Sequence, residues 1–143
     1  MKLALVGLYD RGSLDKERIH VRAEVDLDLT YFIIVDSHYL SPTAVEAGNR
    51  MGYWFVPRLL KKGEHAVVYT RAGSPSTETR PDGSTYHFVF RGHANTLYAS
   101  PNSCAVLMEV QTWVTTSQAL PTYPPPPPVP PAPVNYLNTV LKR

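Results

Sequence analysis

Residues 53–107 constrain the fold more than any other part of the chain. They consist of short runs rich in aromatic and β-branched residues, such as residues 86–90 and 105–107, separated by Gly, Pro, Asn, Asp and Ser. Such runs are typical of strands joined by turns, because β-branched and aromatic side chains pack well on a pleated surface. The sequence therefore predicts an all-β fold, with an antiparallel β-sandwich as the leading architecture.

The residues before this stretch also indicate strands. Ile19, Val21 and Val25 alternate with polar residues, which predicts a strand whose buried side carries these three side chains. Residues 29–35 form a continuous apolar run of strand length, which favours a central strand with both faces covered. Residues 41–48 begin with Ser-Pro and end with Gly, which indicates a short helical turn.

Further strands are predicted at residues 2–9, 53–56 and 66–70. Between the last of these and the run at 86–90, residues 73–84 are rich in Gly, Pro, Ser, Thr and Asp. These residue types favour turns, so this segment is expected to be an exposed loop.

The order of the motifs resembles the lamin tail domain. The chain reads YWFVP, then Lys61-Lys62-Gly63, VVYTRAG, HFVFRG, NTLY and CAVLMEV, and residues 17–21 and 28–36 fit the first strands of that family. The resemblance covers residues 15–112. It implies an immunoglobulin-like antiparallel β-sandwich, as found in nuclear lamins and many bacterial proteins, and a binding role without a catalytic motif.

Proline ends the globular part of the chain. Nine of the 14 prolines fall within residues 120–133, where they remove backbone donors and favour the polyproline II conformation. We therefore expect a β-sandwich at residues 1–118 and a Pro-rich linker at 119–134. At about 3.1 Å per residue this linker is expected to be a semi-rigid spacer, although a polyproline ligand for another domain is an alternative.

Residues 135–143 regain an amphipathic pattern, which predicts a short terminal helix. A helix this short is marginal in water by itself, so it is interpreted as a docking peptide that becomes ordered on a larger protein assembly. Its expected partner-binding residues are Tyr136, Leu137, Val140, Leu141, Lys142 and Arg143.

Charge and hydropathy narrow the class of protein. The 12 acidic residues and 12 of the 14 basic residues lie before residue 119, so the body is neutral, and nucleic acid is an unlikely partner because its binding needs clustered cations. No apolar run reaches the length of a membrane span, and the N-terminal apolar run is too short for a signal peptide. Cys104 is the only cysteine, and a cytoplasmic location is expected.

The histidines and Cys104 are the candidate catalytic and metal-binding residues of the chain. The spacing of His87 and His93, and of Asp36 and His38, matches no zinc or protease motif. Cys104 begins a predicted core strand, which favours an inert thiol. The sequence therefore predicts no catalytic residue, no metal site and no cofactor.

The aromatic residues allow two interpretations. Such residues usually fill the interior of a sandwich, and strand alternation is expected to place about half of them inside. The alternative is an aromatic surface for a ligand. The residues concerned are Tyr53, Trp54, Phe55, Phe88, Phe90 and Trp113.

These observations predict a non-catalytic adaptor or accessory subunit with a protein partner. One alternative is a nucleic-acid or polyanion binding module, which would require six cations to share one face: Arg58, Lys61, Lys62, Arg71, Arg80 and Arg91. The other is a small enzyme, which would require two histidines to converge with a carboxylate. The histidines considered are His20, His38, His87 and His93.

Overall fold

The computed structural model describes residues 1–116, and nearly all of its regular elements are strands. The predicted Pro-rich linker at 119–134 and the docking peptide at 135–143 lie outside the described residues. Residues 1–112 form one unit, which contains every element described below. The described residues contain no helix long and apolar enough to span a membrane.

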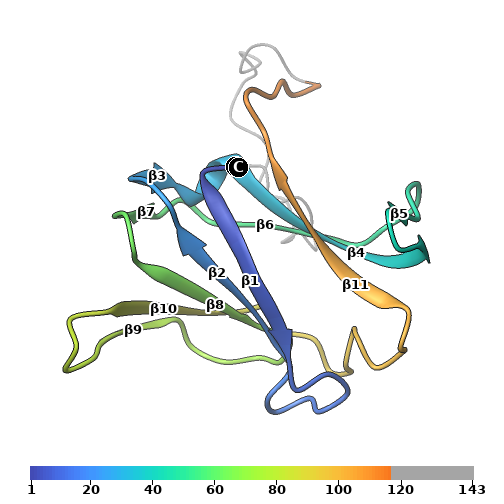
Figure 1. Cartoon of the computed structure of the whole chain (residues 1–143), viewed down its shortest axis with the longest axis horizontal. Coiled ribbons are helices and arrows are strands. Elements are labelled where there is room, and N and C mark those ends of the chain that lie inside the picture. Colours follow the sequence, from blue (N-terminus) through green and yellow to red (C-terminus); the bar gives the residue numbers. More distant parts are fainter. Residues whose placement is uncertain (117–143) are drawn as a thin grey trace, which may run out of the picture. The chain divides into compact units, whose positions relative to one another are not determined.

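A five-stranded sheet forms one layer of this unit (Figure 1). In spatial order its strands are β1 (Leu3–Tyr9), β2 (Arg18–Ala23), β8 (His65–Tyr69), β10 (Thr85–Phe90) and β9 (Ser76–Thr79). Its neighbours are antiparallel except β8 and β10, which run parallel with Phe88 opposite Val67. The prediction of a purely antiparallel arrangement is therefore wrong at this pair, because β9 lies one strand away from β8 and β10 fills the space between them.

A second sheet faces the first. Its central strand β4 (Phe32–Ser41) pairs with β11 (Ser103–Glu109) on one side and with β5 (Ala44–Val45) and β6 (Gly52–Trp54) on the other. A two-stranded ribbon of β3 (Leu27–Asp28) and β7 (Leu59–Leu60) lies beside them. The result is a sandwich-like all-β fold, as predicted.

Several local predictions are wrong for identifiable reasons. Residues 41–48 contain no helical turn, because Ala44 and Val45 pair with the end of β4. The expected loop at 73–84 contains β9, which forms a hairpin with β10 and has all four residues exposed. Val25 is 43% exposed because β2 ends at Ala23, before the alternation reaches it.

The start of the expected central strand is also different. Leu29–Tyr31 form a single 3-10 turn (η1) before β4 begins. The carboxylate of Asp28 accepts a hydrogen bond from the backbone N–H of Thr30 at 2.9 Å, which caps this turn. Leu29 and Phe32 are nevertheless both buried, so the segment still contributes to the core. The expectation that both faces of this run are covered is wrong, because Ile33 and Val35 lie on the side away from the core and are only half-buried.

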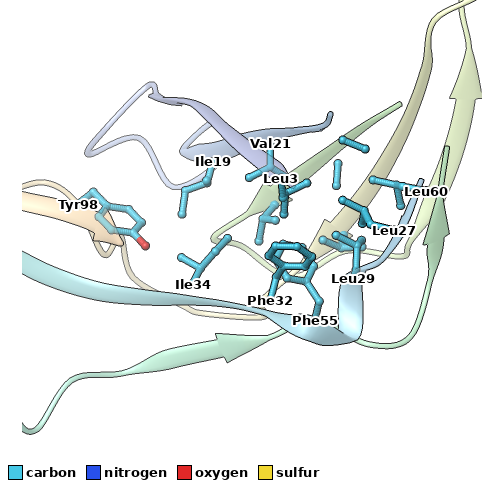
Figure 2. Close-up of a cluster of buried hydrophobic side chains, with 14 residues drawn as sticks. Leu3, Ile19, Val21, Leu27, Leu29, Phe32, Ile34, Phe55, Leu60 and Tyr98 are labelled. Carbon is cyan, nitrogen blue, oxygen red and sulfur yellow. The ribbon is translucent and has the colours of Figure 1, made fainter. Parts of the chain in front are cut away.

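The hydrophobic core lies between the two sheets (Figure 2). Ile19 and Val21 reach it from β2, and Phe32 and Ile34 reach it from β4. Figure 2 shows Tyr98 at one end of the cluster and Leu27 and Leu60 toward the other. The core therefore uses one face of each sheet and leaves the opposite face of each outside it.

Tyr53, Trp54 and Phe55 illustrate this division. Phe55 is 2% exposed and belongs to the core, whereas Trp54 is 45% exposed. The indole N–H of Trp54 donates to the carbonyl of Thr30 at 2.7 Å. The expected alternation is therefore seen here, because Phe55 fills the interior while the side chain of its neighbour Trp54 points to the other face.

Glu17 is fully buried and joins three connecting segments. Its carboxylate accepts hydrogen bonds from the N–H groups of Gly12 (2.9 Å), Leu97 (2.8 Å) and Tyr98 (3.2 Å) and from the hydroxyl of Thr70 (2.7 Å). Burial by itself would raise the pKa of Glu17, but these hydrogen bonds together lower it below its usual value. The ionised carboxylate therefore holds this end of the fold together.

Arg91, Asp36 and Tyr98 form a second buried group that connects the sheets. Two guanidinium nitrogens of Arg91 donate to the two carboxylate oxygens of Asp36, each at 2.8 Å, and the Arg91 side chain is only 2% exposed. The hydroxyl of Tyr98 also donates to Asp36. Because Asp36 lies on β4 and Arg91 follows β10, this ion pair fixes the end of one sheet against the other.

The burial of Phe55 and Trp54 predicts opposite responses to truncation. Phe55→Ala should lower the free energy of unfolding by about 3 to 5 kcal/mol, because it leaves a cavity in the core. Trp54→Ala should cost about 1 kcal/mol, mainly for its hydrogen bond. Urea unfolding of both variants measures the difference, and equal losses would contradict the assigned positions.

Glu17→Gln should lower the free energy of unfolding by about 2 to 3 kcal/mol at pH 7, because it removes a charged acceptor from several donors. The folded-state pKa of Glu17 is lowered, so its contribution is present above the unfolded pKa of about 4.5 and is lost as pH falls through the folded value. The gap between wild type and variant should therefore narrow on acidification. A gap that stays constant from pH 7 to pH 3 would contradict this role.

Candidate functional site

The outer face of the five-stranded sheet carries an unusual set of side chains. Ile19 and Val21 of β2 point into the core, so the alternation of a strand places the residues between and beside them on the outside. The pairing of β2 with β8 and of β8 with β10 extends this row across the sheet. We call this surface the aromatic face. It comprises Tyr9, Arg18, His20, Arg22, His65, Tyr69, Arg71, Arg80, Tyr86, Phe88 and Phe90.

The rings of the aromatic face stack on one another. The rings of His65 and Tyr86 are parallel within 6° at a centroid distance of 4.4 Å, and those of Tyr69 and Phe90 within 13° at 5.2 Å. Neighbouring strands lie about 4.8 Å apart, so parallel rings at this separation stand upright on the sheet. The face consequently presents ring edges and hydroxyl groups, while the flat sides of these rings are used in mutual contact.

Two arginines complete these stacks. The guanidinium carbon of Arg80 lies 3.9 Å from the centroid of the Tyr86 ring, and that of Arg71 lies 5.0 Å from Tyr69 and 4.9 Å from Phe90. A cation against a ring is attracted by the negative face of the π system. Both guanidinium groups are therefore held on the surface in defined positions.

Two other arginines of the face are paired with carboxylates. Arg18 contacts Asp10 at 2.5 Å and Arg22 contacts Glu24 at 2.9 Å, and Arg80 itself lies 3.9 Å from Glu78. These exposed pairs reduce the net positive charge that the face offers to a ligand.

Glycine makes room for two of the rings. A Cβ atom at Gly73 would lie 2.5 Å from the Phe90 ring, and one at Gly7 would lie 2.8 Å from the Tyr9 ring. These rings therefore lie directly against the backbone, and any larger residue at either position would have to displace them.

His20 and His65 contact each other in the middle of the face. Nε2 of His20 lies 2.9 Å from Nδ1 of His65. Burial lowers the pKa of His20 to about 4, with further contributions from His65 and nearby arginines, and burial likewise lowers the pKa of His65. Both imidazoles are therefore neutral at pH 7.

The other histidines proposed from the sequence have separate partners. His38 lies 3.6 Å from Glu46, and His87 Nε2 lies 3.0 Å from Glu64. Burial, followed by the charge of Arg91, lowers the pKa of His93. Two histidines do not converge with a carboxylate, and residues 1–116 contain no group of three or more His, Cys, Asp or Glu able to hold a metal ion.

The six cations required by the polyanion alternative do not share one face. Arg91 is buried against Asp36, and Arg58 Nη1 lies 3.2 Å from the buried His87. Of these six cations, only Arg71 and Arg80 belong to the aromatic face.

The predicted aromatic surface is partly present, with different members. Phe88 and Phe90 belong to the aromatic face, whereas Phe55 lies in the core and Trp54 is on β6. The sequence interpretation missed Tyr9, His20, His65, Tyr69 and Tyr86. Alternation within residues 85–90 could have identified Tyr86 as a neighbour of Phe88, but only the strand pairing brings the others beside it.

Cys104 and the terminal peptide complete the predicted sites. Cys104 is buried, and burial raises the pKa of its thiol, which reduces the thiolate available at neutral pH. The expected partner-binding residues at 136, 137 and 140–143 lie outside the described residues.

Comparisons with protein-family models and with curated proteins gave no match to this chain.

Gly73→Ala should disturb the aromatic face because its methyl group would overlap the Phe90 ring. We expect a loss of about 1 to 3 kcal/mol in the free energy of unfolding, as for other overpacked sites. Gly52→Ala is the control, since its Cβ would meet its nearest neighbours at 3.7 Å. Urea unfolding and ring proton chemical shifts test this, and equal tolerance of both substitutions would contradict the packing.

Proposed function

We propose that this protein is a non-catalytic adaptor or accessory subunit that binds a protein partner through the aromatic face. The observation that carries the proposal is the ordered array of rings and guanidinium groups on the outside of the five-stranded sheet. In the proposed arrangement the C-terminal peptide, residues 135–143, docks the chain onto a larger protein assembly. The protein acts in the cytoplasm.

The composition of the face supports a protein partner. Tyrosine, arginine and phenylalanine are enriched where partners bury their contact surface, and Tyr and Arg provide much of the binding energy. Tyr86 and Arg80 are already held by their stack. Binding would therefore require little further loss of side-chain freedom.

The same geometry argues against single-stranded nucleic acid, the second class considered. Bases bind such surfaces by stacking on exposed ring faces. Here His65 and Tyr86 cover each other, as do Tyr69 and Phe90. The carboxylate partners of Arg18 and Arg22 also weaken the attraction to phosphate.

We further propose that the domain is an immunoglobulin-like sandwich related to the lamin tail domain. The two facing sheets and the sequence motifs from YWFVP to CAVLMEV support this assignment. Fold does not determine function, so the binding role rests on the face and not on the family resemblance.

The test separates the two binding elements. Tagged full-length chain is captured from the cells that produce it, and partners are quantified by mass spectrometry against the double variant Arg71→Glu/Arg80→Glu. We expect this variant to lose at least tenfold of one partner, because both guanidinium positions become acidic. Tyr39→Ser, on an exposed position of the other sheet, is the matched control and should retain it.

The tail is tested in the same experiment. Leu137→Asp, Leu141→Asp and a chain ending at Gln118 should each lose the larger assembly while the partner of the aromatic face remains. A chain ending at Gln118 that keeps the assembly in the same amount would contradict the docking role of the tail. Unchanged capture by the arginine variant would contradict the role of the face.

A further inference from the structure

His20 and His65 are packed with Tyr86 into one group at the centre of the aromatic face. The imidazole nitrogens of the two histidines are 2.9 Å apart, close enough to share a hydrogen. The His65 ring is stacked on Tyr86, and the His20 centroid lies 5.8 Å from the same ring. Arg80 covers Tyr86 in turn. A movement of the two histidines would therefore displace Tyr86 and, with it, Arg80.

The contact limits how many protons the pair can bind. The neutral pair carries two hydrogens on its four ring nitrogens, and one of them forms the bridge between His20 and His65. A first added proton binds the outer nitrogen of the ring that donates, which leaves the bridge intact. A second must bind the accepting nitrogen of the bridge, which places two N–H groups against each other across 2.9 Å. The contact is compatible with one positive charge and incompatible with two.

The surroundings mostly oppose that second charge. Arg18 and Arg22 on β2 and Arg80 after β9 act on His20, and Arg22 and Arg80 act on His65. Asp82 in the β9–β10 turn has the opposite effect on His65, and Glu78 on β9 lies opposite Tyr86 and 3.9 Å from Arg80. The hydroxyl-bearing rings of Tyr9 and Tyr86 also lie beside the pair. Protonation of both rings would therefore break the contact between His20 and His65.

We propose that the His20–His65 pair is an acid-sensitive switch that orders the aromatic face when at most singly charged and releases it when doubly charged. On the second protonation the rings separate, His65 leaves Tyr86, and the stack that positions Arg80 is lost. The claim that this switch regulates partner binding rests on the function proposed above. Its structural part concerns only the side chains of the face.

Nuclear magnetic resonance of the full-length chain tests the switch directly. With ¹³C-labelled histidine and tyrosine, a titration from pH 7.5 to pH 3.5 should show the two imidazoles protonating in separate steps. The ring signals of Tyr86, assigned with Tyr86→Phe, should shift with the lower step. Protonation of both rings in one step near pH 6.5, or Tyr86 signals unchanged through the lower step, would overturn the proposal.

His20→Gln provides a second measurement, because glutamine can hydrogen-bond to His65 but takes up no proton. The folded-state pKa of His20 is about 4, below the unfolded value of about 6.5. Between these two pH values the unfolded chain binds more protons than the folded chain. The urea midpoint of the wild type should therefore decrease as the pH is lowered from about 6.5 to 4. This decrease of the urea midpoint should be smaller in His20→Gln than in the wild type. In the control His38→Gln it should equal that of the wild type. An equal fall in all three proteins would overturn the proposal, and if His20→Gln does not fold, the wild-type titration decides.

These measurements need no partner, so they are independent of the proposed function. A Tyr86 response to the second proton would support the switch even if the face variants kept every partner. Loss of a partner in those variants without a Tyr86 response would remove the switch alone.

Discussion

A buried carboxylate held by neutral hydrogen-bond donors fixes the paths of the segments that connect the strands of this domain. Glu17 is fully enclosed, and a charge in such a place is tolerated only when hydrogen-bond donors replace the water it has lost. The donors come from Gly12, Thr70, Leu97 and Tyr98, which belong to three connecting segments far apart in the sequence. Each segment must therefore take its folded path for the carboxylate to be satisfied.

Tyr98 connects the Glu17 carboxylate to the second sheet. Its N–H donates to Glu17, while its hydroxyl and Arg91 both contact Asp36 on β4. The end of β10 is thereby fixed relative to β8 and to the opposite layer. The aromatic face depends on this arrangement, because its rings come from β8 and β10 and stack only if these parallel strands keep their register.

The sequence predicts the layers of this fold better than its details. Alternation identifies β2 and the run of apolar residues identifies β4, since burial on one or both faces leaves a local pattern. The pairing of Ala44 and Val45 with β4, and the position of exposed β9, leave no such pattern because these short edge strands bury little. The aromatic face was only partly predictable for a related reason: its residues alternate locally, but their assembly depends on non-local pairing.

The position of Cys104 on β11 has a consequence for folding. The last strand of the unit pairs with β4, so that Phe32 lies opposite Glu109, and pairing between residues so far apart in the sequence is entropically costly because a long loop must be closed. Without β11, this edge of β4 would have no strand partner along residues 32–38. Cys104 is the only thiol of the chain and is buried when β11 is in place. Its protection from a thiol reagent therefore reports whether β11 is paired with β4, so the protein contains its own probe of the integrity of the second sheet.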